Sequence, residues 1–357
     1  MKRLHALKQK AFEEKNFDGF LIAKEANILY FAGVPRVTCL LIPRNGEETL
    51  YVYNVNYEQV KTEAKSFQIE LVERDENLMT KVAIQVRYSG IKKLAFDVLT
   101  VESYRSLARA LRGKTRLKPQ NRLVWELRKV KDAEELELMR KAGELTCEGM
   151  KTAYEVIRPG VKEYEAAAEM EYAMRRKGSW GTAFNTIVAS GARSAYPHGG
   201  CTEKEIHYGD LVVVDIGATY RYYHSDMTRT FIAGKPSEKQ KQLYEIVKKA
   251  QEKAIKVIKP KAEAKAIDAV ARKLIEEAGY CEYFVHGLGH GLGLEIHEPP
   301  TLSPQSRDKL VVGNVVTIEP GIYIPGFGGI RIEDTLLVKE RGAEKFTDGF
   351  YNIEADK

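Results

Sequence analysis

Hydrophobic residues in the first third of the chain occur in short runs that alternate with more polar stretches. Four runs rich in β-branched and aromatic side chains favour strands, at residues 19–23, 39–43, 49–55 and 92–97. Residues 77–88 and 101–111 between and after them favour helices. Alternating strands and helices are typical of an α/β layer built around a largely buried sheet.

The pattern changes near Asp132, where a long amphipathic helix is expected. Asp132 is followed three residues later by Glu135, which is the spacing of a capping box. Apolar positions over residues 136–157 fall near one face of a helix, and the Arg-Pro-Gly sequence at 158–160 ends it. A second helix is expected over residues 164–176, before a glycine.

A domain boundary is expected near residue 120, where Pro119 interrupts the pattern. Residues 105–131 around it carry ten basic side chains and one acidic one. Because aromatic residues do not alternate with these charges, a solvated linker surface is favoured over a nucleic-acid site. We therefore expect an α/β fold with an N-terminal domain of residues 1–121 and a C-terminal domain of residues 122–357.

An internal repeat organises the second domain. Two pairs of segments align under it: 150–178 with 251–279 at a shift of 101 residues, and 209–217 with 313–321 at a shift of 104. The second alignment places Asp215 on Glu319, and three residues of further slippage place Asp226 on Glu333. Two helix-helix-strand-strand halves related by a pseudo-two-fold axis would bring these four acids towards one centre.

The duplication changes the interpretation of these acids. A single carboxylate in an apolar run, such as Asp215, is best explained by a structural salt bridge. Four carboxylates at duplicated positions are not, since like charges about 4 Å apart repel by roughly 4 kcal/mol per pair at an effective dielectric constant near 20. Such a cluster needs cations.

Histidines gather in a glycine-rich segment, residues 286–300. His286, His290 and His297 are three of the seven histidines of the chain. The alternating glycines argue against a helix, and therefore against a zinc site in which a helix presents two histidines. His198 is a fourth candidate, on a loop before the Asp215 strand.

Composition narrows the class of protein. Hydrophobic residues make up 44% and charged residues 30% of 357 residues, and no run approaches the roughly 18 apolar residues of a membrane helix. Charged side chains are spread through the first ten residues, which therefore lack the apolar core of a secretory signal. The four cysteines form no CxxC pair, so neither a zinc knuckle nor a thioredoxin-type redox site is expected. Without an export signal, reduced thiols and a cytoplasmic location are expected. The net charge of +6 does not require an anionic partner.

Four motifs occur together and in order: VDIG separated by eight residues from an Asp, HGLGHGLGLEIHE, IEPGIY and RIED. With them the chain resembles the pita-bread metallopeptidases, and in particular the Xaa-Pro peptidases, which include proline dipeptidase (prolidase) and aminopeptidase P. The resemblance implies an N-terminal creatinase-like α/β domain and a catalytic C-terminal pita-bread domain with the internal repeat. It also implies a homodimer that acts on short proline-containing peptides, with no nucleic acid or membrane as partner.

The resemblance also implies roles for individual residues. The positions that match metal ligands are Asp215, Asp226, His290, Glu319 and Glu333. Those that match catalytic or substrate-contacting positions are His198, His286, His297, Arg331 and Glu319. Two divalent ions, Mn, Co, Zn or Fe, would balance the four carboxylates. A hydroxide bridging them would attack the carbonyl that precedes proline, and Glu319 would transfer the proton.

The substrate range stays open within this group. An Xaa-Pro dipeptidase is favoured, and aminopeptidase P, acting on longer peptides, is the alternative. Some dipeptidases carry an arginine where this chain has Thr301; Arg193 or Arg307 could replace it. Phe184 and Tyr323 are candidates for an apolar wall around proline. Methionine aminopeptidase and a non-catalytic binding protein are remoter alternatives.

Overall fold

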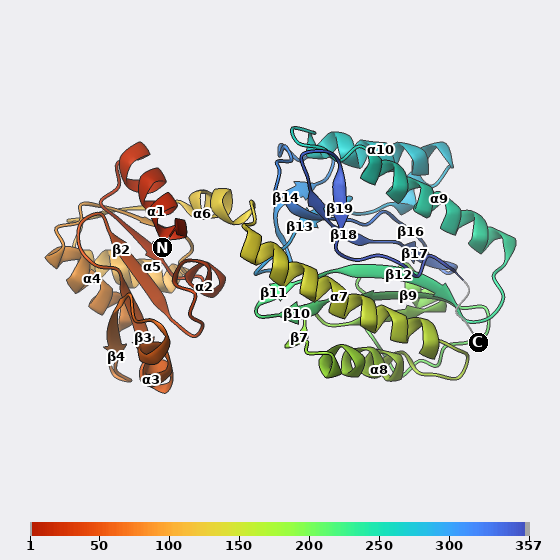
Figure 1. Cartoon of the computed structure of the whole chain (residues 1–357), viewed down its shortest axis with the longest axis horizontal. Coiled ribbons are helices and arrows are strands. Elements are labelled where there is room, and N and C mark those ends of the chain that lie inside the picture. Colours follow the sequence, from red (N-terminus) through yellow and green to blue (C-terminus); the bar gives the residue numbers. More distant parts are fainter. Residues whose placement is uncertain (1, 354–357) are drawn as a thin grey trace. The chain divides into compact units, whose positions relative to one another are not determined.

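The computed structural model describes residues 2–353, and the chain forms two compact units, Met1–Arg128 and Lys129–Lys357 (Figure 1). The fold is mixed α/β, as expected. The boundary expected between residues 121 and 122 stays a prediction, and the helix that begins at Asn121 belongs to the first unit. Within the described residues, no helix has both the length and the apolar character that a membrane span requires.

The first unit is built around a six-stranded mixed sheet. In sheet order its strands are β4 (Gln68–Val72), β3 (Thr49–Tyr53), β2 (Cys39–Pro43), β1 (Gly19–Ile22), β5 (Lys93–Phe96) and β6 (Arg116–Pro119). Its helices are α1 (Lys2–Lys8), extended by a π-helical turn at Gln9–Glu14, α2 (Glu25–Ala32), α3 (Asn54–Glu63), α4 (Leu78–Tyr88), α5 (Val101–Leu111) and α6 (Asn121–Arg128). The four expected strands and two expected helices are confirmed.

The basic stretch of residues 105–131 is not a linker surface. It forms part of α5, β6 and α6, which belong to the first unit. Arg128 is 1% exposed, donates to Asn27 Oδ1 at 2.6 Å, and lies over the Trp125 ring. The prediction of solvated charge holds for seven of the ten basic side chains, which are exposed. The assignment to a linker was wrong, because residues up to Arg128 form elements of the first unit.

The second unit contains two helix pairs, as the repeat predicts. The first pair is α7 (Ala133–Val156) and α8 (Glu163–Arg176); the second is α9 (Glu238–Lys256) and α10 (Ala264–Glu277). The capping box is confirmed: Asp132 Oδ1 accepts from the Glu135 amide and Glu135 Oε2 from the Asp132 amide, both at 3.0 Å. Each pair covers its own hydrophobic core, and the strands lie between the two pairs (Figure 1).

The strands of the second unit form two main sheets and two small ones. The first half contains β8 (Ile187–Ser190), β9 (Leu211–Ile216) and β12 (Met227–Ile232) in the order β12-β9-β8, beside β7 (Gly181–Thr182), β10 (Ala218–Tyr220) and β11 (Tyr223–His224). The second half contains, in sheet order, β14 (Glu298–Leu302), β13 (Gly289–Gly291), β15 (Val315–Ile318), β18 (Asp334–Val338) and β19 (Ala343–Lys345), beside the hairpin β16 (Gly321–Ile324) and β17 (Gly328–Arg331).

The two halves are joined where β12 meets the end of β17 and the start of β18. The Glu333 amide donates to Thr228 O at 3.0 Å, and the Arg331 amide donates to Thr230 Oγ1 at the same distance. Arg229 and Asp334 form an ion pair at 2.8 Å in which neither side chain is exposed. This joint places β12, which follows Asp226, beside the start of β18, which follows Glu333. Predicted acids from the two halves of the repeat therefore come together here.

Candidate metal centre and active site

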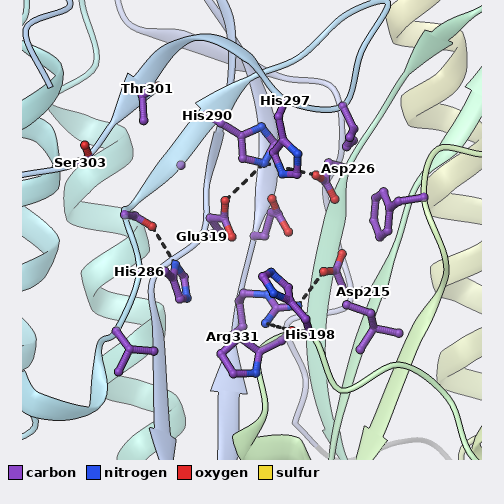
Figure 2. Close-up of a pocket in the computed structure, with 18 of the residues that line it drawn as sticks. His198, Asp215, Asp226, His286, His290, His297, Thr301, Ser303, Glu319 and Arg331 are labelled. Atoms are coloured by element: carbon purple, nitrogen blue, oxygen red, sulfur yellow. Dashed lines mark hydrogen bonds and ion pairs between the residues drawn. The ribbon is translucent and has the colours of Figure 1, made fainter. Parts of the chain in front are cut away.

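The four acids of the repeat occupy matching places on their strands. Asp215 lies in β9 and Asp226 directly precedes β12, the partner strand of β9. Glu319 directly follows β15 and Glu333 directly precedes β18, the partner strand of β15. All four line one cavity of about 790 Å³, in which Figure 2 labels Asp215, Asp226 and Glu319. The structure therefore brings together the carboxylates that the repeat alignment pairs.

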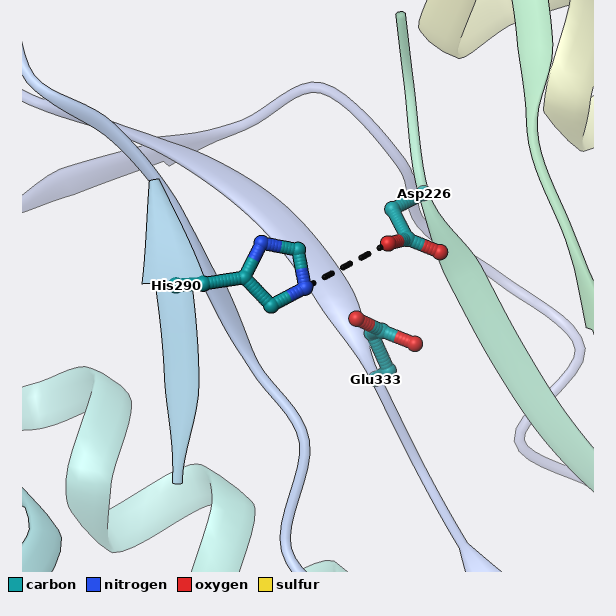
Figure 3. A group of neighbouring side chains, drawn as sticks. All are labelled: Asp226, His290 and Glu333. Atoms are coloured by element: carbon teal, nitrogen blue, oxygen red, sulfur yellow. Dashed lines mark ion pairs between the residues drawn. The ribbon is translucent and has the colours of Figure 1, made fainter. Parts of the chain in front are cut away.

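His290 lies on β13 and faces these carboxylates. Its Nε2 is 3.6 Å from Asp226 Oδ2 and 3.5 Å from Glu319 Oε1. Its Nδ1 is 3.0 Å from the carbonyl of Gly291, which requires the proton on Nδ1 and leaves the Nε2 lone pair directed at the acids. One ligand atom each from Asp226, His290 and Glu333 lie within 4.8 Å of one another (Figure 3).

The electrostatics of this cluster call for cations. Burial, with the neighbouring carboxylates, raises the pKa of Asp226 and of Glu333 well above the ordinary range, and burial raises the pKa of Glu319 to about 8. Burial lowers the pKa of His290 to about 4. Asp215 Oδ1, Asp226 Oδ1 and Glu333 Oε1 are buried with no hydrogen-bond partner among the described residues. Carboxylates with unsatisfied oxygens beside a neutral imidazole fit divalent cations.

Threonine hydroxyls hold two of the acids, and the sequence pattern did not reveal them. Thr228 Oγ1 donates to Glu333 Oε2 at 2.6 Å, and Thr317 Oγ1 donates to Glu319 Oε1 at 3.2 Å. Thr228 is two residues after Asp226, and Thr317 is two residues before Glu319, so each shares a strand face with an acid. The two-residue spacing between each threonine and an acid is the feature of the sequence that could have identified both threonines.

Arg331 holds a third acid, Asp215. Its Nη2 donates to Asp215 Oδ2 at 2.6 Å, and its Nη1 donates to the Tyr323 hydroxyl at 2.8 Å. The same hydroxyl is 2.9 Å from His286 Nε2. The buried guanidinium thus fixes Asp215 and is linked through Tyr323 to His286 on another wall of the cavity.

His198, His286 and His297 line the same cavity as the acids (Figure 2). Burial and the charge of Arg331 lower the pKa of His286 to about 4, and burial lowers the pKa of His297. The His297 ring lies 4.4 Å from that of His290, measured between centroids. The imidazoles of His286 and His297 are therefore neutral at pH 7. Both ring nitrogens of His286 have partners, the Gly287 carbonyl at 2.8 Å and the Tyr323 hydroxyl at 2.9 Å, so His297 is the one of the two that can bond to a ligand.

Some of the finer expectations fail. Phe184 lines the cavity, but Tyr323 does not; it is 4% exposed and bonded to His286 and Arg331. Arg193 is paired with Glu163, and Arg307 is not part of the lining. Thr301 and Ser303 contribute to the lining instead. All four cysteines are free, as expected.

Comparison with known proteins extends this picture to the whole chain. The model of metallopeptidase family M24 matches residues 137–340, and that of the creatinase/prolidase N-terminal domain matches residues 3–130. A Pyrococcus furiosus protein called Xaa-Pro dipeptidase is 42% identical over 340 residues, 95% of each chain.

Two solved structures resemble the whole chain. The prolidase from Pyrococcus horikoshii has a TM-score of 0.93 at 39% identity, covering 99% of this chain and 100% of its own. The X-Pro aminopeptidase from Thermotoga maritima has a TM-score of 0.85 at 37% identity, covering 95% and 97%. The expected pita-bread fold and the resemblance to Xaa-Pro peptidases are confirmed. On its sequence and its fold, the chain belongs to metallopeptidase family M24.

Proposed function

We propose that this protein is a metal-dependent Xaa-Pro dipeptidase, which hydrolyses the peptide bond that precedes proline. The observation that carries the proposal is the convergence of four duplicated carboxylates and His290 in one cavity. Relatives named dipeptidase or prolidase support the substrate class, and the prolidase from P. horikoshii has a higher TM-score than the X-Pro aminopeptidase, 0.93 against 0.85.

The residues that would hold two divalent ions, Mn, Co, Zn or Fe, are Asp215, Asp226, His290, Glu319 and Glu333. Their three unpartnered carboxylate oxygens support this assignment, because each offers a free lone pair in a buried site. When bound, the ions would supply a water of lowered pKa and polarise the scissile carbonyl. Four ionised carboxylates and two divalent ions also balance in charge.

Glu319 would move the proton. Its carboxylate would take a proton from the attacking water and deliver it to the prolyl nitrogen as the peptide bond breaks. A pKa of about 8 in the absence of ions reflects how strongly burial favours its protonated form. His198 and His297 would bind the substrate and the developing oxyanion, His286 would hold Tyr323, and Arg331 would orient Asp215.

The preference for proline follows from amide chemistry and cavity shape. An Xaa-Pro bond is a tertiary amide, so its nitrogen has no hydrogen for a site to recognise. Phe184 together with Val285 and Ile296 gives the cavity apolar surface against which a pyrrolidine ring can pack. Selection would therefore rest on the ring rather than on an amide donor.

Release of proline from Gly-Pro by the metal-loaded protein tests this function. We expect turnover of Gly-Pro and little turnover of Gly-Pro-Gly, with Glu319→Gln as the inactive control. Cleavage of the tripeptide alone would instead identify an aminopeptidase P. Hydrolysis of neither peptide under any of the four metals would contradict the proposal.

The remaining expectations stay predictions. These are a homodimer and a cytoplasmic location. Residues 1–121 are expected to support dimerisation and to narrow the entrance to the site, and residues 122–357 to carry out catalysis. Size-exclusion chromatography with light scattering at micromolar concentration tests the homodimer, and a mass of 40.4 kDa would contradict it.

A further inference from the structure

The loop of residues 191–202 carries His198 and is here called the His198 loop. His198 lines the cavity (Figure 2), but no described residue holds its ring by a hydrogen bond, and the residue is exposed. The place from which the ring reaches the cavity therefore depends on the backbone that carries it. Whatever holds the His198 loop sets the position of the Cα–Cβ bond and so the region that the imidazole can reach.

Glu163, the first residue of α8, binds both ends of this loop. Its side chain has no exposed surface. Oε1 accepts from the amide and the hydroxyl of Ser190, both at 2.8 Å. Oε2 accepts from the amide of Thr202 at 3.0 Å and its hydroxyl at 2.7 Å. One carboxylate thus closes the loop at its base, where the chain leaves β8 and where it returns.

Arg193 carries this constraint to the middle of the loop. Its Nη1 pairs with Glu163 Oε2, and its Nη2 donates to the carbonyl of Gly199, the residue after His198. The carbonyl of Pro197, the residue before His198, accepts from Arg331 Nη1 at 3.3 Å. The backbone is therefore held on both sides of the histidine, and Glu163 and Arg193 hold one of them.

The second half of the repeat contains a similar arrangement. Asp268 of α10 accepts from Arg272 Nε at 2.8 Å and Nη2 at 2.9 Å, and from the amide of Leu288 at 3.1 Å. Arg272 Nη2 also donates to the carbonyl of His286 at 2.8 Å. In both halves, a buried acid on the second helix uses an arginine to hold the backbone that carries a histidine of the cavity.

We propose that Glu163 and Arg193 are positioning residues that keep His198 directed at the substrate. This inference rests on the proposed function, in which His198 contacts the substrate. Neither residue lines the cavity, so both act through His198. The buried carboxylate accepts four hydrogen bonds from neutral donors, and Arg193 is its cationic partner.

A double-mutant cycle tests the proposal. The variants are Arg193→Gln, His198→Ala and the two combined, assayed for kcat on Gly-Pro with saturating metal. Arg193→Gln removes the link to Gly199 but leaves Glu163 its four other donors. We expect it to lower kcat about 10-fold or more in the natural background, since small misplacements of a contacting group have effects of this size. In the His198→Ala background it should lower kcat less than about twofold.

Hydrogen exchange supplies a readout that does not depend on activity. Exchange in residues 191–202 should accelerate at least about tenfold in Arg193→Gln, while residues 284–288, held by Asp268, stay unchanged. Arg140→Gln is the matched control, because it breaks the 2.9 Å ion pair with Glu344 in the same unit and should change neither readout. Thr202→Val removes one neutral donor and serves if Arg193→Gln does not fold.

Each failure has a separate meaning. Equal loss of kcat in both backgrounds, or unchanged exchange in the His198 loop, would overturn the positioning role. An unchanged kcat in His198→Ala would overturn it as well, because the residues would then have nothing to act through. If the unsubstituted protein hydrolyses no Xaa-Pro peptide, the proposed function is overturned. The exchange measurement would still show whether Glu163 and Arg193 hold the His198 loop.

Discussion

The two halves of the second unit place carboxylates at matching positions, aspartates in the first half and glutamates in the second. The strands next to these acids carry different side chains. In the first half, β8 lies next to β9, and its Ile187 pairs with Asp215. In the second half, β13 lies next to β15 in the corresponding place and carries His290. Both Ile187 and His290 line the cavity. The duplicated positions thus provide negative charge in both halves, whereas β13 presents a histidine where β8 presents Ile187.

Glycines on both sides of His290 allow β13 to occupy this place. A Cβ on Gly289 would lie 2.1 Å from Thr317 O, and one on Gly291 would lie 2.5 Å from Pro299 O. Only glycine lets β13 pass this closely between its neighbours, which sets His290 opposite the acids. Under the proposed function, the four symmetric acids would hold the ions together with His290, which has no equivalent at Ile187 in the first half.

The largest effect is expected from Glu333→Lys, which breaks the symmetric set. A lysine at this 1% exposed position would put a cation beside Asp226 in place of a carboxylate, so binding of two divalent ions should be lost. Metal analysis should fall from about two ions per chain to below one, with no detectable turnover. Glu340→Lys, at an exposed glutamate nearby in sequence, is the control. Two ions retained in Glu333→Lys would contradict the ligand assignment.

Matched substitutions at Asp215 and Glu319 sharpen the comparison. Both Asp215→Asn and Glu319→Gln remove one charge from equivalent positions, so both should weaken metal affinity. At saturating metal, however, kcat of Glu319→Gln should remain about 10²–10³-fold below that of Asp215→Asn, because only Glu319 also transfers the proton. Equal kcat values would show that the halves do not differ in this step.

Metal removal should make stability depend on pH. The folded-state pKa values of Asp226, Glu319 and Glu333 are raised, to about 8 for Glu319, so the unfolded chain loses these protons at lower pH than the folded chain. The stability that these three groups contribute to the metal-free protein is thus fully present below pH 4 and is lost as the pH rises towards 8 and beyond. We expect its Tm to fall by roughly 5–10 °C between pH 5 and pH 8.

The metal-loaded protein is the control for this measurement. Bound cations remove the repulsion among the carboxylates, so the Tm of the loaded protein should not fall over the same interval. Differential scanning calorimetry of both forms provides the comparison. A metal-free Tm that rises between pH 5 and pH 8 would contradict the expected direction of this dependence.

The smallest effect is expected from Cys201→Ser. Cys201 lies in the His198 loop, but its Sγ donates only to the carbonyl of Thr186, at 3.0 Å, and a serine hydroxyl can donate there too. We expect kcat within about twofold of the natural value and a change in unfolding free energy of about 0.5 kcal/mol or less. A large loss of activity would reveal a role for this thiol.

The sequence predicted the site well where its own repetition or local chemistry was visible. The alignment of Asp215 with Glu319 and of Asp226 with Glu333 needed no coordinates, and the capping box at Asp132 depends on neighbours three residues apart. Glu163 could not be identified in this way. It lies at the start of a charged helix, and its partners are 27 to 39 residues further along the chain.

The missed elements of the first unit have a related explanation. In α3 only Val60 is buried, so no apolar stripe marks this helix in the sequence. β4 lies at the edge of its sheet, and of its five residues only Val72 is buried. Such elements are stabilised by backbone pairing and by the position of their neighbours, which a hydrophobic pattern does not record.

The joint between the halves has a consequence for the order of events during synthesis. Glu333 is held by Thr228, and Asp334 by Arg229, across separations of more than one hundred residues. A growing chain that ends before β18 has made Asp215 and Asp226 but lacks the residues that complete their surroundings. Under the proposed function, the binding of ions would therefore have to wait until β18 has been synthesised and has packed against β12.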